Sequence, residues 1–196
     1  MINVTIGRLT RSTTTDYVFA CKVPEPEVPT FGAFVKAPSQ RGQAYVLGLI
    51  YNIAFADDML VRQLAATDNL PEEMVQDQRQ NRQVPIEVSV LAIGYRMNST
   101  YVYALPPQPP VTLNQISPCD NDEICEFTQR LDFLRLILNS MVTMADELVT
   151  TAILAAAACH PNEDREKFLR SAGRELARLL GRDLARLDNL LRRIRP

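Results

Sequence analysis

The hydrophobic pattern of this sequence changes its period once, and a proline-rich stretch marks the change. The run Pro-Pro-Gln-Pro-Pro at 106–110 lacks the amide donors of a central strand and favours an extended polyproline conformation. Before it, short runs of β-branched and aromatic residues are separated by glycine and proline, which is typical of strands. After it, apolar residues recur at steps of three and four, which is typical of helices. The sequence therefore predicts a β domain, a linker and a helical domain.

The β part contains several short strand-like segments. The clearest are residues 17–21, 31–35, 45–51, 86–95 and 101–103. The last two resemble a hairpin that turns near Asn98. Short strands at this spacing, punctuated by glycine and proline, are typical of a β-barrel or sandwich. We predict a small closed β-barrel over residues 1–105 that folds without the helices, followed by a proline-rich linker over residues 106–118.

Residues 119–196 are predicted to be helical, so the fold class is α+β. A helical period begins near Asp122, and the acidic residues between 120 and 126 suit the positive end of a helix dipole. Pro161 disfavours helix at His160 and ends this first helix. Asn162, with two acidic residues after it, starts a second one. We expect the two helices to form a helical hairpin.

The second helix carries an apolar stripe. It includes Leu176, Leu180, Leu184, Leu187 and Leu191. Two long helices with such stripes expose more apolar surface than a lone hairpin covers, and contiguous exposed apolar surface marks interfaces. We therefore predict that these leucines drive self-association into a homo-oligomer. Burial against the barrel is the alternative.

The second helix also carries a series of arginines. They recur every four residues, at Arg170, Arg174, Arg178, Arg182 and Arg186, and Arg192, Arg193 and Arg195 follow them. Residues 161–196 hold ten Lys/Arg against six Asp/Glu, whereas the rest of the chain holds eleven against seventeen. A planar guanidinium suits two-point contact with carboxylate or phosphate. Three interpretations stay open: ion pairs with the acidic body or a protein partner, contact with nucleic acid, and plain solvation. The acidic pI of about 5.5 argues against a dedicated DNA binder.

Four motifs occur in order along the β part. They are Ile6-Gly7-Arg8-Leu9 followed by a threonine-rich turn and Asp16-Tyr17-Val18-Phe19, then Phe31-Gly32-Ala33-Phe34-Val35, then Val46-Leu47-Gly48-Leu49-Ile50, and last Val90-Leu91-Ala92-Ile93-Gly94 before the proline-rich exit. In this order and spacing, residues 1–116 resemble the HAS barrel, the small N-terminal β-barrel of HerA-type DNA translocases and of rotary ATP synthase subunits. The resemblance implies a barrel architecture and a tendency to assemble.

The sequence departs from that family after the barrel. In those ATPases the barrel leads into a phosphate-binding loop, whose backbone amides and lysine hold the nucleotide. No G-x-x-x-x-G-K-[S/T] motif occurs in this sequence, and its three lysines, Lys22, Lys36 and Lys167, lie outside any glycine-rich loop. ATP hydrolysis is therefore not carried over, and we expect no cofactor.

Candidate catalytic and metal-binding residues are few. His160 is the single histidine, so a Ser-His-Asp or Cys-His arrangement has to use it; beside Pro161 we expect it to cap a helix or face solvent. Cys119, Cys125 and Cys159 complete a conceivable zinc set with it. Neither the C-x5-C spacing nor the adjacent Cys-His pair is usual for structural zinc. The sequence therefore predicts no catalytic or metal site and a protein that is not an enzyme.

The remaining expectations concern compartment and function. No secretory signal is recognisable, and the longest unbroken apolar run, residues 152–159, is far shorter than the roughly 20 residues that span a bilayer. Reduced cysteines in a cytoplasmic protein that does not enter the membrane fit these features. We predict a non-enzymatic assembly or adaptor protein that self-associates or docks on a ring-shaped ATPase. The alternative is a nucleic-acid-processing accessory protein whose C-terminal arginines contact phosphate.

Overall fold

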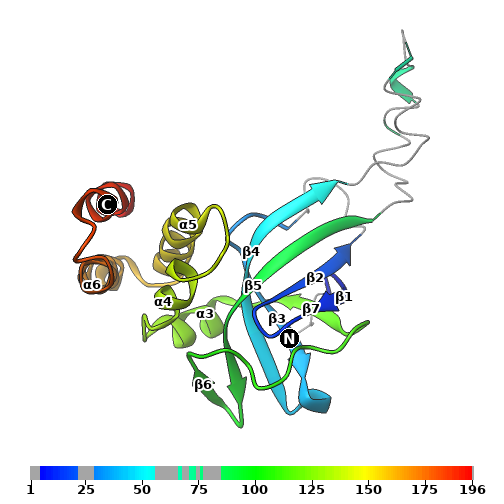
Figure 1. Cartoon of the computed structure of the whole chain (residues 1–196), viewed down its shortest axis with the longest axis horizontal. Coiled ribbons are helices and arrows are strands. Elements are labelled where there is room, and N and C mark those ends of the chain that lie inside the picture. Colours follow the sequence, from blue (N-terminus) through cyan, green and yellow to red (C-terminus); the bar gives the residue numbers. More distant parts are fainter. Residues whose placement is uncertain are drawn as a thin grey trace.

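The structure, a computed structural model, describes residues 5–21, 29–55, 66–67, 71–73, 76 and 85–195. Strands come first along the chain, and helices α3 to α7 follow them (Figure 1). These helices lie on one side of the strands, with α6 and α7 farthest away. None of the described helices combines the length and the hydropathy needed to cross a membrane.

The strands close into a small barrel, which confirms the predicted α+β architecture. They are β1 (Gly7–Ser12), β2 (Asp16–Cys21), β3 (Phe34–Ser39), β4 (Ala44–Phe55), β5 (Ile86–Met97), β6 (Thr100–Val102) and β7 (Gln115–Pro118), with a short 3-10 turn η1 (Gln40–Gly42) after β3. The order around the ring is β2-β1-β7-β3-β4-β5, and β5 pairs with β2 to close it, all neighbours being antiparallel. β6 extends β5 as a hairpin whose turn residues, Asn98 and Ser99, have positive φ angles.

Side chains fill the inside of the barrel. Successive residues of a strand point to opposite faces, and the inward set forms one buried cluster, which includes Leu9, Tyr17, Phe19, Val46, Val88, Val90 and Ile116. Gly48 faces the same interior. A Cβ on Gly48 would lie 2.4 Å from Val90 Cγ1 and 2.9 Å from the Tyr17 hydroxyl, so no larger residue fits there. The described interior is therefore a packed core and not a channel.

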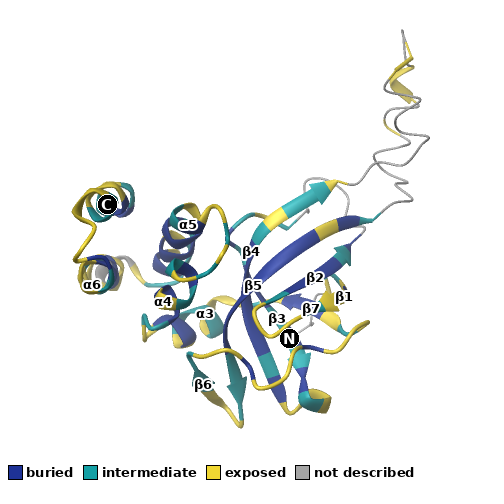
Figure 2. Ribbon diagram, viewed as in Figure 1, coloured by how far each residue is buried: buried dark blue, intermediate teal, exposed yellow. Residues whose placement is uncertain are grey.

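β4 and β5 are buried on their outer face as well. Leu47 and Leu49 of β4, with Leu91 and Ile93 of β5, point away from the barrel interior, yet none is more than 6% exposed. These residues belong to a second core that they share with α3 (Asn121–Thr128), α4 (Phe133–Leu138) and α5 (Ala145–Ala158). Figure 2 shows the buried residues running from these strands into the helices. The barrel and the helices thus have one common core between them.

Aromatic side chains of α3 and α4 dominate that common core. Phe127 stacks on Tyr103 with ring centroids 5.0 Å apart and meets Tyr101 edge-on at 5.5 Å. Phe133 lies 5.4 Å from Phe127 and 6.4 Å from Phe34 of the barrel. Such tilted and edge-to-face pairs add to the free energy gained by burying the rings.

The start of α3 is held by its acidic residues, as the sequence predicted. The Asp120 carboxylate accepts a hydrogen bond from the Glu123 amide at 2.9 Å, and the Glu123 carboxylate accepts one from the Asp120 amide at 3.1 Å. This reciprocal pair is a capping box. Glu123 also forms an ion pair with Lys36 of β3, and both side chains are largely buried. The cap of α3 is therefore tied to the barrel.

α5 is the centre of the helical layer. It contacts α3, α4, β4, α6 (Asn162–Leu179) and α7 (Leu184–Ile194). Its sequence, ADELVTTAILAAAA, is rich in small side chains that let neighbouring elements approach, and eight of its residues are buried. The turn before β3 shows how close the approach is, since a Cβ on Gly32 would lie 2.3 Å from Thr151 Cγ2. α5 therefore joins the outer helices to the barrel.

The predicted hairpin of two long helices is wrong in detail. The first is broken into α3, α4 and α5, and the second into α6 and α7. After α4, the Ser140 hydroxyl donates to the Ile137 carbonyl at 2.7 Å. Before α7, the Asp183 side chain accepts from the Arg186 amide and caps the new helix. The predicted break at Pro161 is confirmed.

The stretch predicted as a linker is part of the barrel. Pro106 and Pro110 are buried, and the Ser12 hydroxyl donates to the Pro110 carbonyl at 2.7 Å. β7 follows within the same stretch and pairs with both β1 and β3. The barrel consequently extends to Pro118, because its ring is incomplete without β7.

We expect a fragment ending at Pro110 not to fold. It lacks β7, which leaves the facing edges of β1 and β3 unpaired, and it lacks the helices that cover the outer face of β4 and β5. Far-UV circular dichroism and thermal melting of the fragment, beside the full chain prepared in the same way, measure this. A soluble fragment with a β-type spectrum and a cooperative melt would contradict it.

Phe127→Ala tests the common core. Phe127 is fully buried, so the substitution should lower the free energy of unfolding by about 3–5 kcal/mol. Urea denaturation followed by circular dichroism gives the value, and Leu184→Ala, at a 70% exposed position, is the control with a change within about 0.5 kcal/mol. Separate transitions for strand and helix signals in the wild type would show that the two parts do not share a core.

Candidate binding groove

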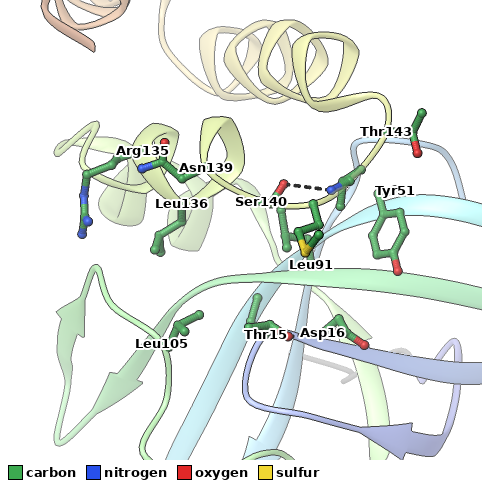
Figure 3. Close-up of a pocket in the computed structure, with 13 residues that line it drawn as sticks. Thr15, Asp16, Tyr51, Leu91, Leu105, Arg135, Leu136, Asn139, Ser140 and Thr143 are labelled. Atoms are coloured by element: carbon green, nitrogen blue, oxygen red, sulfur yellow. Dashed lines mark hydrogen bonds between the residues drawn. The ribbon is translucent and has the colours of Figure 1, made fainter.

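A groove of about 500 Å³ lies where the barrel, α4 and the loop between α4 and α5 meet (Figure 3). Its lining comes from five separate stretches of the chain. These supply Thr15 and Asp16 at the β1–β2 turn, Tyr51 of β4, Leu91 and Ala92 of β5, Leu105, and Arg135, Leu136 and residues 139–143 on α4 and the following loop. Leu91 belongs to the common core, so the groove is the place where the helical cover of the barrel ends.

Exposed apolar side chains border the groove. Met141 in the α4–α5 loop is fully exposed, and Leu105 on the β6–β7 connection is 43% exposed. Met144, three residues after Met141, is also exposed. Methionine is unbranched and adapts to irregular surfaces, and exposed apolar residues around a concave site mark binding surfaces.

Hydrogen bonds hold the polar parts of the groove in place. The Asp16 carboxylate accepts from the hydroxyls of Thr13 and Thr15, at 2.9 and 2.8 Å. In the loop, the Ser140 hydroxyl accepts from the Val142 amide at 3.4 Å (Figure 3). The groove therefore presents an ordered surface with a carboxylate on one side and the exposed Arg135 guanidinium on another.

The chemistry of the lining suits binding. Its titratable side chains are Asp16, Tyr51 and Arg135, and the described lining includes neither histidine nor cysteine. The Thr15 hydroxyl donates to the Asp16 carboxylate at 2.8 Å, and this contact helps to hold the β1–β2 turn beside the groove.

The arginine series divides into paired and unpaired members. Arg186 binds Asp146 of α5 through two nitrogens, at 2.6 and 2.8 Å, and this carboxylate raises the pKa of Arg186. Arg170 pairs with Glu166 at 3.3 Å and Arg178 with Glu175 at 2.6 Å, both within α6. Two further members, Arg174 and Arg182, are exposed, and no carboxylate of the described residues pairs with them.

A similar ion pair lies near Arg186. Arg193 of α7 binds the carboxylate of Glu147, and this guanidinium lowers the pKa of Glu147. Asp146 and Glu147 are neighbours in the first turn of α5. The contact of α7 with this turn is therefore partly electrostatic, and Arg186 and Arg193 of the predicted arginine series both contribute to it.

The predicted leucine stripe lies mostly inside the chain's own core. Leu176 and Leu180 are buried, and Leu187 and Leu191 pack partly buried against the same cluster. Leu184 is the exposed member of the five. The prediction that these leucines form a contact between copies is therefore corrected for the buried members, because α5, α6 and α7 pack against one another there.

Three of the residues weighed as zinc ligands do come together. The Cys125 thiol donates to the Cys159 carbonyl at 3.1 Å and lies 3.9 Å from His160 Nδ1. Cys119 is apart from them, near Glu123, and burial raises the pKa of its thiol well above the usual value. Among the described residues, no group of three His, Cys, Asp or Glu side chains is arranged to hold a metal ion.

His160 differs from its prediction as a solvent-facing or capping residue. Its ring stacks on Phe168 with centroids 4.8 Å apart. Its Nε2 atom is buried and has no hydrogen-bond partner among the described residues. His160 therefore packs between the end of α5 and α6.

Sequence reasoning missed the groove itself. Met141 and Val142 continue the helical period that begins near Asp122, so that period predicts one helix through them. The signal against this was the polar pair Asn139-Ser140 directly before them, because such side chains bond to the backbone and favour helix ends. No local sequence pattern marks Leu105 as a groove residue, because the other groove residues come from segments far away in the sequence.

Comparison with known protein families and curated proteins identified no related protein. No protein-family model matches the chain, and no curated protein matches it significantly in sequence. The resemblance to HAS barrels stays a prediction from the motifs, and function has to be argued from the groove and the charged helices.

Proposed function

We propose that this protein is a non-enzymatic adaptor that binds a protein partner in the groove between the barrel and the α4–α5 loop. The observation that carries the proposal is Met141, a fully exposed methionine in a hydrogen-bonded loop at the edge of a 500 Å³ groove. When a partner covers a large apolar side chain that is exposed to water, the free energy of the system falls. Its place beside a concave surface supports a docking role.

The chemistry of the rim favours a protein over a small ligand. Exposed apolar residues border the groove on two sides, Leu105 on one and Met141 on the other. Protein interfaces combine such an apolar centre with a polar rim, and methionine and arginine are enriched in them. Asp16 and Arg135 supply the polar rim, with one charge of each sign.

By resemblance to HAS barrels, we further propose that the partner is a ring-shaped ATPase. The support is the closed six-stranded barrel together with the four motifs, one of which contains Gly48, the glycine that the barrel interior requires. This chain would contribute the barrel and its helical cover, and the partner the motor. Its cytoplasmic location belongs to the same proposal.

A second candidate function rests on Arg174 and Arg182. These exposed arginines point to a nucleic-acid accessory role, in which they contact phosphate. The pairing of Arg170, Arg178 and Arg186 with carboxylates favours the adaptor, because a guanidinium already bound to a carboxylate has to break that contact before it binds phosphate.

Met141→Glu tests the groove. A charge there opposes burial, so capture of the partner in cross-linked pull-downs from the native host should fall by at least about tenfold. Leu184→Glu, at an exposed position outside the groove, is the matched control and should capture the partner like the wild type. Circular dichroism checks that both variants fold, and sedimentation velocity shows whether the partner is a second copy. Equal capture by wild type and Met141→Glu would refute the groove.

Heparin chromatography tests the second candidate. We expect the wild type to elute at low salt, and Arg174→Glu/Arg182→Glu to elute like it. Each phosphate contact contributes about one unit to the slope of log affinity against log salt concentration. Strong retention, with a slope that falls by about two in the double variant, would favour nucleic acid instead.

A further inference from the structure

We propose that Cys125 and Cys159 form a redox-active dithiol, with His160 as its base, that a small-molecule disulfide oxidises to an intramolecular Cys125–Cys159 bond. The site lies at the contact of α3 with the turn between α5 and α6, away from the groove. The inference is therefore independent of the adaptor function.

Two hydrogen bonds place the two cysteines against each other. Asn121 and Cys125 lie one turn apart on α3, so their side chains share a face. Cys159, which ends α5, lies against that face: its thiol donates to Asn121 Oδ1 at 3.6 Å, while the Cys125 thiol donates to the Cys159 carbonyl at 3.1 Å. Burial raises the pKa of Cys159, and the nearby Cys125 thiol adds to this shift. Both residues are partly exposed, so a small oxidant reaches them.

His160 supplies a base, which two thiols alone lack. Its Nδ1 lies 3.9 Å from Cys125 Sγ, and stacking on Phe168 fixes the ring. Burial raises the pKa of Cys125, and the neighbouring Asp122 adds to this. Little thiolate therefore forms at neutral pH without a base. A fixed imidazole beside the thiol can take its proton as the sulfur attacks.

The oxidation balances with oxidised glutathione as the oxidant. Cys125 passes its proton to His160 and attacks one glutathione sulfur, which breaks the glutathione S–S bond and releases one glutathione thiolate. Cys159 then attacks Cys125 Sγ, forms the protein disulfide and releases the second glutathione. The two protons of the protein thiols end on two molecules of glutathione, and the two electrons reduce the glutathione disulfide.

The bond would fasten α3 to the α5–α6 turn. α3 packs on the barrel through Phe127 and Glu123, so the oxidised protein would hold its helical cover covalently. A cross-link that closes the 125–159 loop restricts the unfolded chain. We therefore expect a higher Tm for the oxidised protein than for the reduced protein.

The test oxidises the full-length protein with oxidised glutathione and maps its peptides by mass spectrometry. We expect a linked peptide pair containing Cys125 and Cys159, a loss of two titratable thiols, and a Tm that rises and returns on reduction. Cys119→Ser is the matched control and should form the same bond. Cys159→Ser should stop at a stable glutathione adduct on Cys125, whereas Cys125→Ser should react slowly, because the base His160 lies beside Cys125. His160→Gln should slow the reaction by at least about tenfold.

Three results would overturn the inference. In the first, the wild type keeps both thiols free or stops at a stable glutathione adduct. In the second, the linked peptide pair includes Cys119. In the third, a folded His160→Gln variant reacts at the wild-type rate. The peptide map of the wild type decides the bond even where a variant fails to fold.

Discussion

The fold depends on burying the outer face of β4 and β5. A closed barrel hides the inward face of its strands, but here Leu47 and Leu91 point outward and are covered by α3, α4 and α5. Because α6 and α7 reach the barrel mainly through α5, the whole helical part follows from that one contact. The groove follows too, since Leu91 contributes to both the common core and the groove lining.

That double burial is visible in the sequence. Residues 45–51 and 90–95 are continuously apolar, and a strand covered on both faces has this pattern, whereas one with a solvated face alternates. The barrel and the helical region were predictable from periodicity alone. β7 was not, because its four residues include one large apolar side chain, Ile116, and its strand conformation depends on β1 and β3, which pair with it from far away in the chain.

For the candidate-site residues too, local sequence patterns predict the contacts within one helix but not those between distant segments. Arg170 and Glu166 are one helical turn apart, so their pairing could be predicted from spacing, whereas Arg186 and Asp146 meet across forty positions. Helical period also continued through the α4–α5 loop, which hid Met141 in an apparent apolar stripe. The groove draws on segments from Thr15 to Thr143, and no local pattern brings such segments together.

The two ion pairs of α7 lie next to the groove loop, at the first turn of α5. Asp146 and Glu147 open α5, where acidic side chains favour the positive end of the helix dipole, and they directly follow the loop that carries Met141. Arg186 and Arg193 bind these two carboxylates, so α7 holds the first turn of α5 in place. Because one end of the loop is fixed in this way, the loop loses less conformational entropy when a partner binds. In the proposed adaptor, Arg186 and Arg193 would therefore act through the position of the groove loop, without having to touch the partner.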